Sequence, residues 1–221
     1  MKTRLYNHRT KSAYTLDLFQ WIRPFDDGST FYQNWYAQIL RALDVMYYRN
    51  ATDDCFQYTY NSNGANLLIH FNIGHIYSQC EKQPLLLLRK EKVPLNKFDI
   101  YSFPCEYAYH YALNWKFPAH AVSDFPVLCC YAPVQKNNQL LVIDGNHRVT
   151  IKKMLHIKSV NLFEYQVNSP LDFANDFEYL VFHFLMEYNK PPQDRLINPA
   201  DGLSMPWLDN KWNVLHQILM F

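Results

Sequence analysis

The first clear pattern in the chain is an apolar repeat with a helical period. Between residues 31 and 46, apolar side chains recur every three or four positions, and this spacing predicts a helix over about 30–49. Ser29 or Thr30, just before the first apolar residue, suits the N-cap position. The next stretch, 50–64, is polar and includes Asn-Ser-Asn-Gly, so we expect a loop there.

Two apolar segments follow. Residues 65–79, ANLLIHFNIGHIYSQ, are apolar enough to be buried, but their spacing does not distinguish a helix from a strand. Residues 84–95, PLLLLRKEKVPL, predict a strand that Pro94 ends. His70 and His75 lie five positions apart, which puts them on one side of neither a helix nor a strand. We therefore expect core or boundary histidines there and no shared metal site.

The pattern in the second half predicts strand, strand, glycine turn, short helix and strand. The strands are FPVLCCYAPV (125–134), LLVID (140–144) and SVNLFEYQV (159–167), and the first two are expected to form a hairpin. Gly145 breaks the second strand. The run from His147 to about His156 predicts an amphipathic short helix, with Lys152 and Lys153 facing solvent. Its apolar side consists of Val149, Ile151, Met154 and Leu155.

The pattern of residues 169–221 predicts helices. Ser169-Pro170-Leu171-Asp172 combines a cap, a proline and an acid, as at a helix start. The apolar stripe behind it consists of Phe173, Phe177, Val181, Phe184 and Tyr188, and prolines at 191 and 192 end the helix. Residues 206–221 suit a terminal helix.

Together these elements predict a mixed α+β fold whose sheet contains both parallel and antiparallel pairs. We expect an aromatic-rich N-terminal layer over 1–90, containing helix and strand. A core follows over 91–168, and helices over 169–221 pack on that core.

Composition narrows the class of protein. Hydrophobic residues make up 49% of the 221 positions and charged residues 19%, so a sizeable core can be buried. The formal net charge of +1 gives no sign of a general nucleic-acid binder. The five cysteines form no CxxC pair, and the N-terminus lacks an apolar leader. A cytoplasmic protein without membrane segments is the expectation.

The candidate chemistry lies in Asp144-Gly145-Asn146-His147-Arg148, between an apolar strand and an amphipathic helix. The first turn of a helix offers backbone N–H groups without partners inside the helix, and Gly145 allows a ligand to approach closely. His147 and Arg148 add donors, which together predict a phosphate site. Asp144 would bind a bridging metal ion or take a proton from an acceptor. Asp-Gly-Asn alone also suits a plain helix cap, and His-Arg in the first turn favours a site.

Residues 125–167 resemble the core of the ParB/sulfiredoxin superfamily, and the resemblance extends back to about residue 92 at VPLNKFDIY. Val142-Ile143-Asp144-Gly145-Asn146-His147-Arg148 is similar to the family's Asp-Gly-x-His-Arg variants. The resemblance implies a ParB/sulfiredoxin-like core that binds nucleotide phosphates at the turn through residues 145–148. The first 90 residues and about the last 50 show no such resemblance.

The motif of this chain differs from those of the known branches of the superfamily, and the differences indicate which branch it resembles. Sulfiredoxins carry cysteine where this chain has Asn146, so their sulfur nucleophile is missing here. Partition proteins carry a Gly-Glu-Arg-Arg-like motif followed by a helix-turn-helix, which 168–221 lacks. Free-serine kinases carry the similar Asp-Gly-His-His-Arg and use an upstream glutamate. That likeness makes Glu106 a candidate catalytic residue beside Asp144 and His147, although a surface glutamate is an alternative.

The expected function is a nucleotide-binding enzyme that carries out Mg²⁺-assisted phosphoryl transfer or nucleoside triphosphate hydrolysis, with Asp144 on the metal. The nucleotide would be ATP, ADP or CTP, and the acceptor an unidentified small molecule or protein. A DNA-associated partition-like protein or nuclease is one alternative, and the near-neutral charge counts against nucleic acid as a partner. A non-catalytic interaction module is the other, and the oligomeric state stays open.

Overall fold

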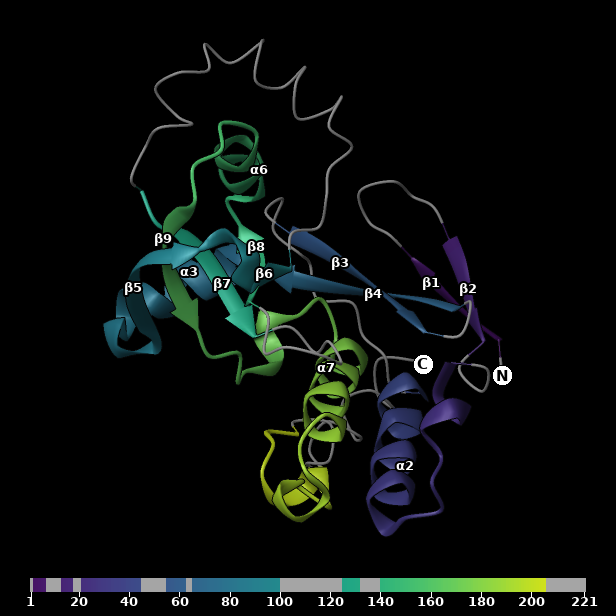
Figure 1. Cartoon of the computed structure of the whole chain (residues 1–221). Helices are drawn as coiled ribbons and strands as arrows, with labels where there is room; N and C mark the ends of the chain where they lie inside the picture. The colour runs from purple at the N-terminus through teal and green to yellow at the C-terminus, as the bar shows by residue number, and fades with distance from the viewer. Residues whose placement is uncertain are drawn as a thin grey trace, which may run out of the picture. The chain divides into compact units, whose positions relative to one another are not determined.

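The computed structural model describes residues 2–6, 13–17, 21–44, 55–62, 65–99, 125–131 and 140–205. The chain divides into two compact units (Figure 1). The first unit combines Met1–Asn72 with Asn168–Phe221, and the second is Ile73–Val167. Both helices and strands occur, and the strands pair in parallel and antiparallel fashion, so the predicted mixed α+β class is confirmed.

The first unit contains two separate pairs of antiparallel strands. Strand β1 (Lys2–Tyr6) pairs with β2 (Ala13–Asp17), and β3 (Cys55–Ser62) pairs with β4 (Ala65–Asn72). The loop predicted over 50–64 is therefore wrong for the residues of β3. Tyr58 and Tyr60, two positions apart, are both buried. Gln57, which directly precedes Tyr58, is exposed. The sequence from Phe56 to Asn61 does alternate as in a half-buried strand, but the loop prediction relied on the polar composition and on Asn-Ser-Asn-Gly at 61–64, where β3 ends.

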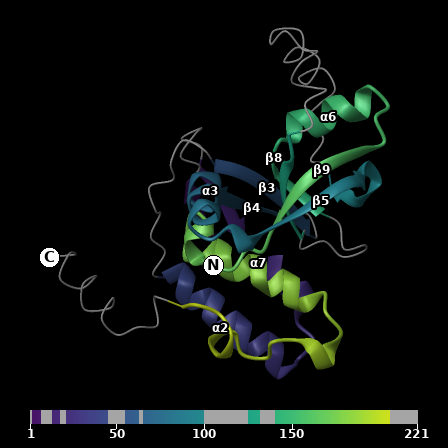
Figure 2. The same cartoon turned by 90° about the vertical axis from the view of Figure 1, so that its left-hand side faces the viewer.

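Two helices of the first unit, α2 (Thr30–Asp44) and α7 (Asp176–Tyr188), lie side by side in both views (Figures 1 and 2). Ser29 caps α2, since its Oγ accepts the Tyr32 amide at 3.1 Å. The helix starts where the sequence predicts, and residues beyond Asp44 lie outside the described part. Rings fill the space between the helices, with Phe31 stacked on Phe184 at 5.8 Å and Trp35 beside it.

Helix α7 starts later than predicted. Ser169 does cap a turn, but that turn is the short 3-10 helix Pro170–Asp172, after which Phe173 is extended. The α-helix begins at Asp176, because the Asn175 side chain accepts the Glu178 amide at 2.8 Å. Phe173 makes a bridge to Phe71 of β4, so the first ring of the predicted stripe belongs to the segment before the helix.

The segment with no clear period contains two elements. Residues 65–72 form β4, and α3 (Ile73–Lys82) starts directly after it, at the boundary between the units. A period of two followed by a period of 3.6 gives no single repeat, which explains the ambiguity.

The second unit contains a five-stranded sheet in the order β5-β9-β7-β8-β6. Its strands are β5 (Leu87–Pro94), β6 (Phe98–Asp99), β7 (Val127–Tyr131), β8 (Leu140–Asp144) and β9 (Ser159–Tyr165). The β7–β8 pair is antiparallel, as predicted. The β7–β9 and β6–β8 pairs are parallel, and β5 pairs with β9 in the antiparallel sense.

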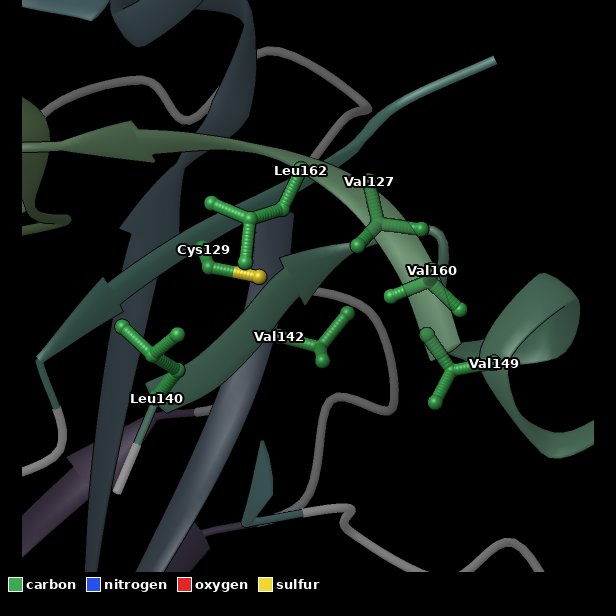
Figure 3. Close-up of a cluster of buried hydrophobic side chains, with 7 residues drawn as sticks. All are labelled: Val127, Cys129, Leu140, Val142, Val149, Val160 and Leu162. Carbon is green, nitrogen blue, oxygen red and sulfur yellow. The ribbon is translucent and has the colours of Figure 1, made fainter. Parts of the chain in front are cut away.

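Helix α6 (Asn146–Met154) connects β8 to β9 and closes one part of the core. Figure 3 shows Val149 of this helix among strand side chains, and the full cluster is Val127, Cys129, Leu140, Val142, Val149, Val160 and Leu162. The predicted faces of α6 need correction. Lys153 is exposed, but Lys152 is buried, while Met154 and Leu155 at the C-terminal end are exposed.

Short 3-10 turns complete the described chain, at Arg23–Phe25, Pro84–Leu86, Leu95–Lys97, Pro170–Asp172, Pro192–Asp194 and Pro199–Asp201. Within the described ranges, every helix is too short or too polar to cross a membrane. The predicted terminal helix at 206–221 lies outside the described residues, as does Glu106.

Candidate functional site

The β8–α6 turn has the backbone form that the motif predicts. Strand β8 ends at Asp144, and Gly145 is the N-cap residue with φ 93°, a conformation that favours glycine. The first hydrogen bond of the helix is donated by the Val149 amide to the Gly145 carbonyl at 3.1 Å. The amides of residues 146–148 therefore precede the hydrogen-bond ladder of the helix, and the helix dipole adds partial positive charge at this end.

The turn is closely packed around Gly145. A Cβ at this position would lie 2.8 Å from Cγ1 of Val127 and 2.8 Å from Nη2 of Arg148. Strand β7 and the arginine side chain therefore both approach the glycine, and the guanidinium lies directly over the turn. No other residue type fits here without a shift of its neighbours.

Arg148 is held in place by several interactions. Its Nη1 donates to the carbonyl oxygens of Phe125 at 3.0 Å and Pro126 at 3.1 Å. Its Cζ lies 5.1 Å from the centre of the Phe125 ring, a cation–π arrangement. Its Nη2 lies 3.8 Å from Oδ2 of Asp144. One edge of the guanidinium thus supports the start of β7, and the other faces Asp144.

Asp144 receives a second partner from a distant part of the sequence. The Tyr77 hydroxyl, on α3, donates to Oδ2 of Asp144 at 2.6 Å. Burial raises the pKa of Tyr77, and the hydrogen bond to Asp144 raises it further, so the phenol keeps its proton and remains a donor. The Asp144 side chain stays 42% exposed, so it can meet a ligand.

The structure limits the role that Asn146 can have in the predicted phosphate site. Its side chain is buried, and Nδ2 donates to the Val142 carbonyl at 2.8 Å. Oδ1 of Asn146 has no hydrogen-bond partner among the described residues. The Thr150 hydroxyl donates to the Asn146 carbonyl at 2.8 Å, which fixes the first helical turn further. The predicted contact with phosphate can therefore involve the backbone amide of Asn146 but not this side chain.

The turn thus brings together Asp144, Gly145 and Arg148, with the Asn146 amide beside them. The His147 backbone lies in the first turn of α6, but its side chain is outside the described part of the structure, and so is all of Glu106. Tyr77 was missed by sequence reasoning. It is 67 positions from Asp144, and no local motif marks a contact over that separation.

The arrangement fits the groups that the motif implies. A guanidinium over a left-handed glycine, next to free helix amides, suits phosphate oxygens. The Asp144 oxygens are hard ligands of the kind that Mg²⁺ prefers. Across the described ranges, no cluster of three or more His, Cys, Asp or Glu side chains could hold a metal ion. A single carboxylate still fits Mg²⁺, because this ion is often bound by one or two carboxylates together with substrate phosphates.

A second polar cluster is buried in the first unit. Glu178 of α7 is fully buried, and its carboxylate accepts hydrogen bonds from the backbone and the side chain of His70 on β4. The two distances are 2.6 Å from the His70 amide and 2.9 Å from Nδ1. Nδ2 of Asn175 also donates to Glu178, at 3.0 Å. These contacts join β4 to the first turn of α7.

Two histidines in the described part of this unit, His70 and His183, differ in the direction of their pKa shifts. Burial disfavours the charged form of His70, but the hydrogen bond to Glu178 and its negative charge outweigh burial and raise the pKa above 6.5. Burial, with a smaller contribution from Lys190, lowers the pKa of His183 to about 4. His70 is thus a buried histidine, in agreement with the predicted core or boundary position, and it is bound to a carboxylate, while the half-buried His183 favours the neutral form.

Comparisons of the chain with protein-family models, with curated proteins and with solved structures give no match. The resemblance to the ParB/sulfiredoxin superfamily therefore stays a prediction that depends on the motif and on the order of strand, turn, helix and strand.

Proposed function

We propose that the protein binds a nucleotide through its phosphates at the β8–α6 turn and, with Mg²⁺, transfers or hydrolyses the terminal phosphoryl group. The observation that carries the proposal is the position of Arg148. Its guanidinium lies over Gly145, the N-cap residue of α6, and within 4 Å of Asp144. A ParB/sulfiredoxin-like core over residues 91–168 is part of the same proposal.

The residues of the turn divide the task between them. Arg148 and the amides of residues 146–148 bind and neutralise phosphate oxygens, and Gly145 lets the Arg148 guanidinium pack directly over the turn. Asp144 holds the ion or receives a proton. Such positioning and charge neutralisation account for most of the catalysis of phosphoryl transfer.

The reaction needs no covalent nucleophile on the protein. The bond between the bridging oxygen and the terminal phosphorus breaks, and the nucleoside diphosphate leaves. A new phosphorus–oxygen bond forms to an acceptor hydroxyl or to water, whose proton passes to Asp144 or to solvent. His147 and Glu106 stay candidates for assisting this step.

Thermal stability in the presence of ATP, ADP, CTP or GTP, each with and without Mg²⁺, tests the proposal. A nucleotide at a hundred times its dissociation constant adds about 2.7 kcal/mol to the free energy of unfolding. For a protein of this size that raises the melting temperature by about 5–10 °C. The wild type should respond to at least one nucleotide, and Arg148→Ala should not respond.

Two matched variants separate ligand binding from folding. Arg148→Ala also loses the hydrogen bonds to Phe125 and Pro126, so its ligand-induced shift is compared with its own ligand-free melting temperature. Lys153→Ala removes an exposed cation from the same helix and should respond like the wild type. A wild type that no nucleotide stabilises, with or without Mg²⁺, would leave residues 144–148 as a helix cap.

Asp144→Asn tests the proposed role of Asp144 in binding Mg²⁺ or accepting a proton. Asparagine still offers an oxygen to the Tyr77 hydroxyl but carries no charge. Turnover should be abolished, while nucleotide binding without Mg²⁺ persists. Asp194→Asn, at an exposed carboxylate in the other unit, is the control. Normal turnover in folded Asp144→Asn would refute the role of Asp144.

A further inference from the structure

The two oxygens of the Asp144 carboxylate have different surroundings. Oδ2 accepts the Tyr77 hydroxyl at 2.6 Å and lies 3.8 Å from Nη2 of Arg148. Oδ1 makes no hydrogen bond or ion pair within the described part of the unit, and the side chain is 42% exposed. The carboxylate is therefore fixed through one oxygen and open through the other.

Tyr77 is well placed to fix the carboxylate. It lies on α3 next to the buried stripe of Ile73, Ile76 and Cys80, which anchors the helix at positions three and four residues apart. The ring is half-buried, so the hydroxyl moves little relative to α3. A short hydrogen bond from such a donor selects one orientation of a carboxylate that would otherwise rotate.

We propose that Tyr77 is a positioning residue for Asp144, holding the carboxylate so that Oδ1 meets the divalent cation that accompanies the nucleotide. This inference rests on the proposed function. It assigns Asp144 to the cation and not to proton transfer. Residues that orient a metal ligand by hydrogen bonding typically change metal affinity by 10- to 100-fold when they are removed.

Arg148 is compatible with a cation at Oδ1. The guanidinium lies 3.8 Å from Oδ2, and its hydrogen bonds to the carbonyl oxygens of Phe125 and Pro126 hold it there. Phosphate oxygens between the two positive charges would bind both, as they do in other phosphoryl-transfer sites.

Broadening of backbone amide signals by Mn²⁺, in deuterated full-length protein without nucleotide, tests this inference. Mn²⁺ is a paramagnetic substitute for Mg²⁺ and reveals weak sites that calorimetry misses. In the wild type, broadening should centre on residues 144–148. It should vanish in Asp144→Asn, and Tyr77→Phe should need about tenfold more Mn²⁺ for the same effect.

Tyr77→Phe removes one oxygen and keeps the ring, and the amide spectrum shows whether the variant is folded. Tyr131→Phe, at an exposed tyrosine of β7 in the same unit, should behave like the wild type. The double variant Tyr77→Phe/Asp144→Asn should match Asp144→Asn, because Tyr77 acts through the carboxylate.

The outcomes separate this inference from the proposed function. Unchanged broadening in folded Tyr77→Phe, or no broadening at the turn in the wild type, overturns the inference. A wild type that shows Mn²⁺ broadening at residues 144–148 but binds no nucleotide overturns the proposed function alone. A nucleotide-binding wild type in which Tyr77→Phe changes nothing overturns the inference alone.

Discussion

Removal of the Glu178 side chain should be among the most damaging single changes in the first unit. Its carboxylate is fully buried and accepts three hydrogen bonds, two from His70 and one from Asn175. Glu178→Ala leaves all three donors without their acceptor, in a place that bulk water does not reach. The contact between β4 and the start of α7 depends on these bonds.

The expected loss follows from the cost of buried donors without partners. Each such donor costs about 1–3 kcal/mol, and breaking a buried ion pair by removing one partner costs about 3–5 kcal/mol. Water that enters the vacated space replaces some of the bonds, so the sum of three separate costs overstates the loss. We expect Glu178→Ala to lower the free energy of unfolding by about 3–5 kcal/mol.

The free energy of unfolding of Glu178→Gln should lie between those of the wild type and of Glu178→Ala. Its amide oxygen can accept one or two of the three hydrogen bonds, but its NH₂ group then faces a donor. We expect a loss of about 1–3 kcal/mol for this variant. Glu81→Ala, at an exposed glutamate of α3, is the control and should change stability by less than about 0.5 kcal/mol.

Urea unfolding followed by tryptophan fluorescence measures these differences. Trp21 and Trp35 are fully buried in the same unit and report on its unfolding. The raised pKa of His70 adds a pH test. Its stabilising contribution is complete below pH 6.5 and is lost as the pH rises through the higher pKa of the folded state. A Glu178→Ala protein within about 1 kcal/mol of wild type would refute the reasoning.

Two further predictions concern Gly145 and His183. Gly145→Ala should lower stability by about 2–4 kcal/mol in the same assay, because the new Cβ would be strained and would lie 2.8 Å from Val127. Gly28→Ala, with φ 71° and no atom within 4 Å, should cost only the backbone strain of about 1–2 kcal/mol, and equal losses in both variants would contradict the packing argument. His183 has a pKa of about 4 when folded and 6.5 when unfolded, so its contribution to stability is lost as the pH falls from 6.5 to 4. Removing this titration in His183→Gln should flatten the pH dependence of unfolding by about 3 kcal/mol over that window, and an unchanged slope would show that His183 is not responsible.

The region from 125 to 167 was predictable because each element carries its own local signal. Strands β7 and β8 are almost entirely apolar, and Gly145 marks the end of β8. Helix α6 begins at Asn146, one residue before the predicted amphipathic run from His147. The pairing of β7 with β9 was not predicted, because a parallel pair has no signal in the sequence between its strands.

Elements whose stability comes from distant contacts were harder to predict. Strand β3 alternates polar and aromatic residues, but the turn signal at 61–64 outweighed this pattern, and the fold shows that Tyr58 and Tyr60 are buried. The late start of α7 reflects Phe173, whose bridge to Phe71 outweighs the helix signal before it. Burial of Lys152 likewise depends on the surroundings of α6 and not on its own period.

The same reasoning explains which part of the site the sequence revealed. The motif supplies the turn, but three of the groups that hold its charged side chains come from elsewhere in the chain. Tyr77 orients Asp144 from α3, and the carbonyl oxygens of Phe125 and Pro126 hold Arg148. Because these contacts form when the second unit folds, the two charged side chains are ordered before any ligand arrives. If the turn binds the proposed nucleotide, the side chains of Asp144 and Arg148 lose less conformational entropy on binding, because these contacts already order them.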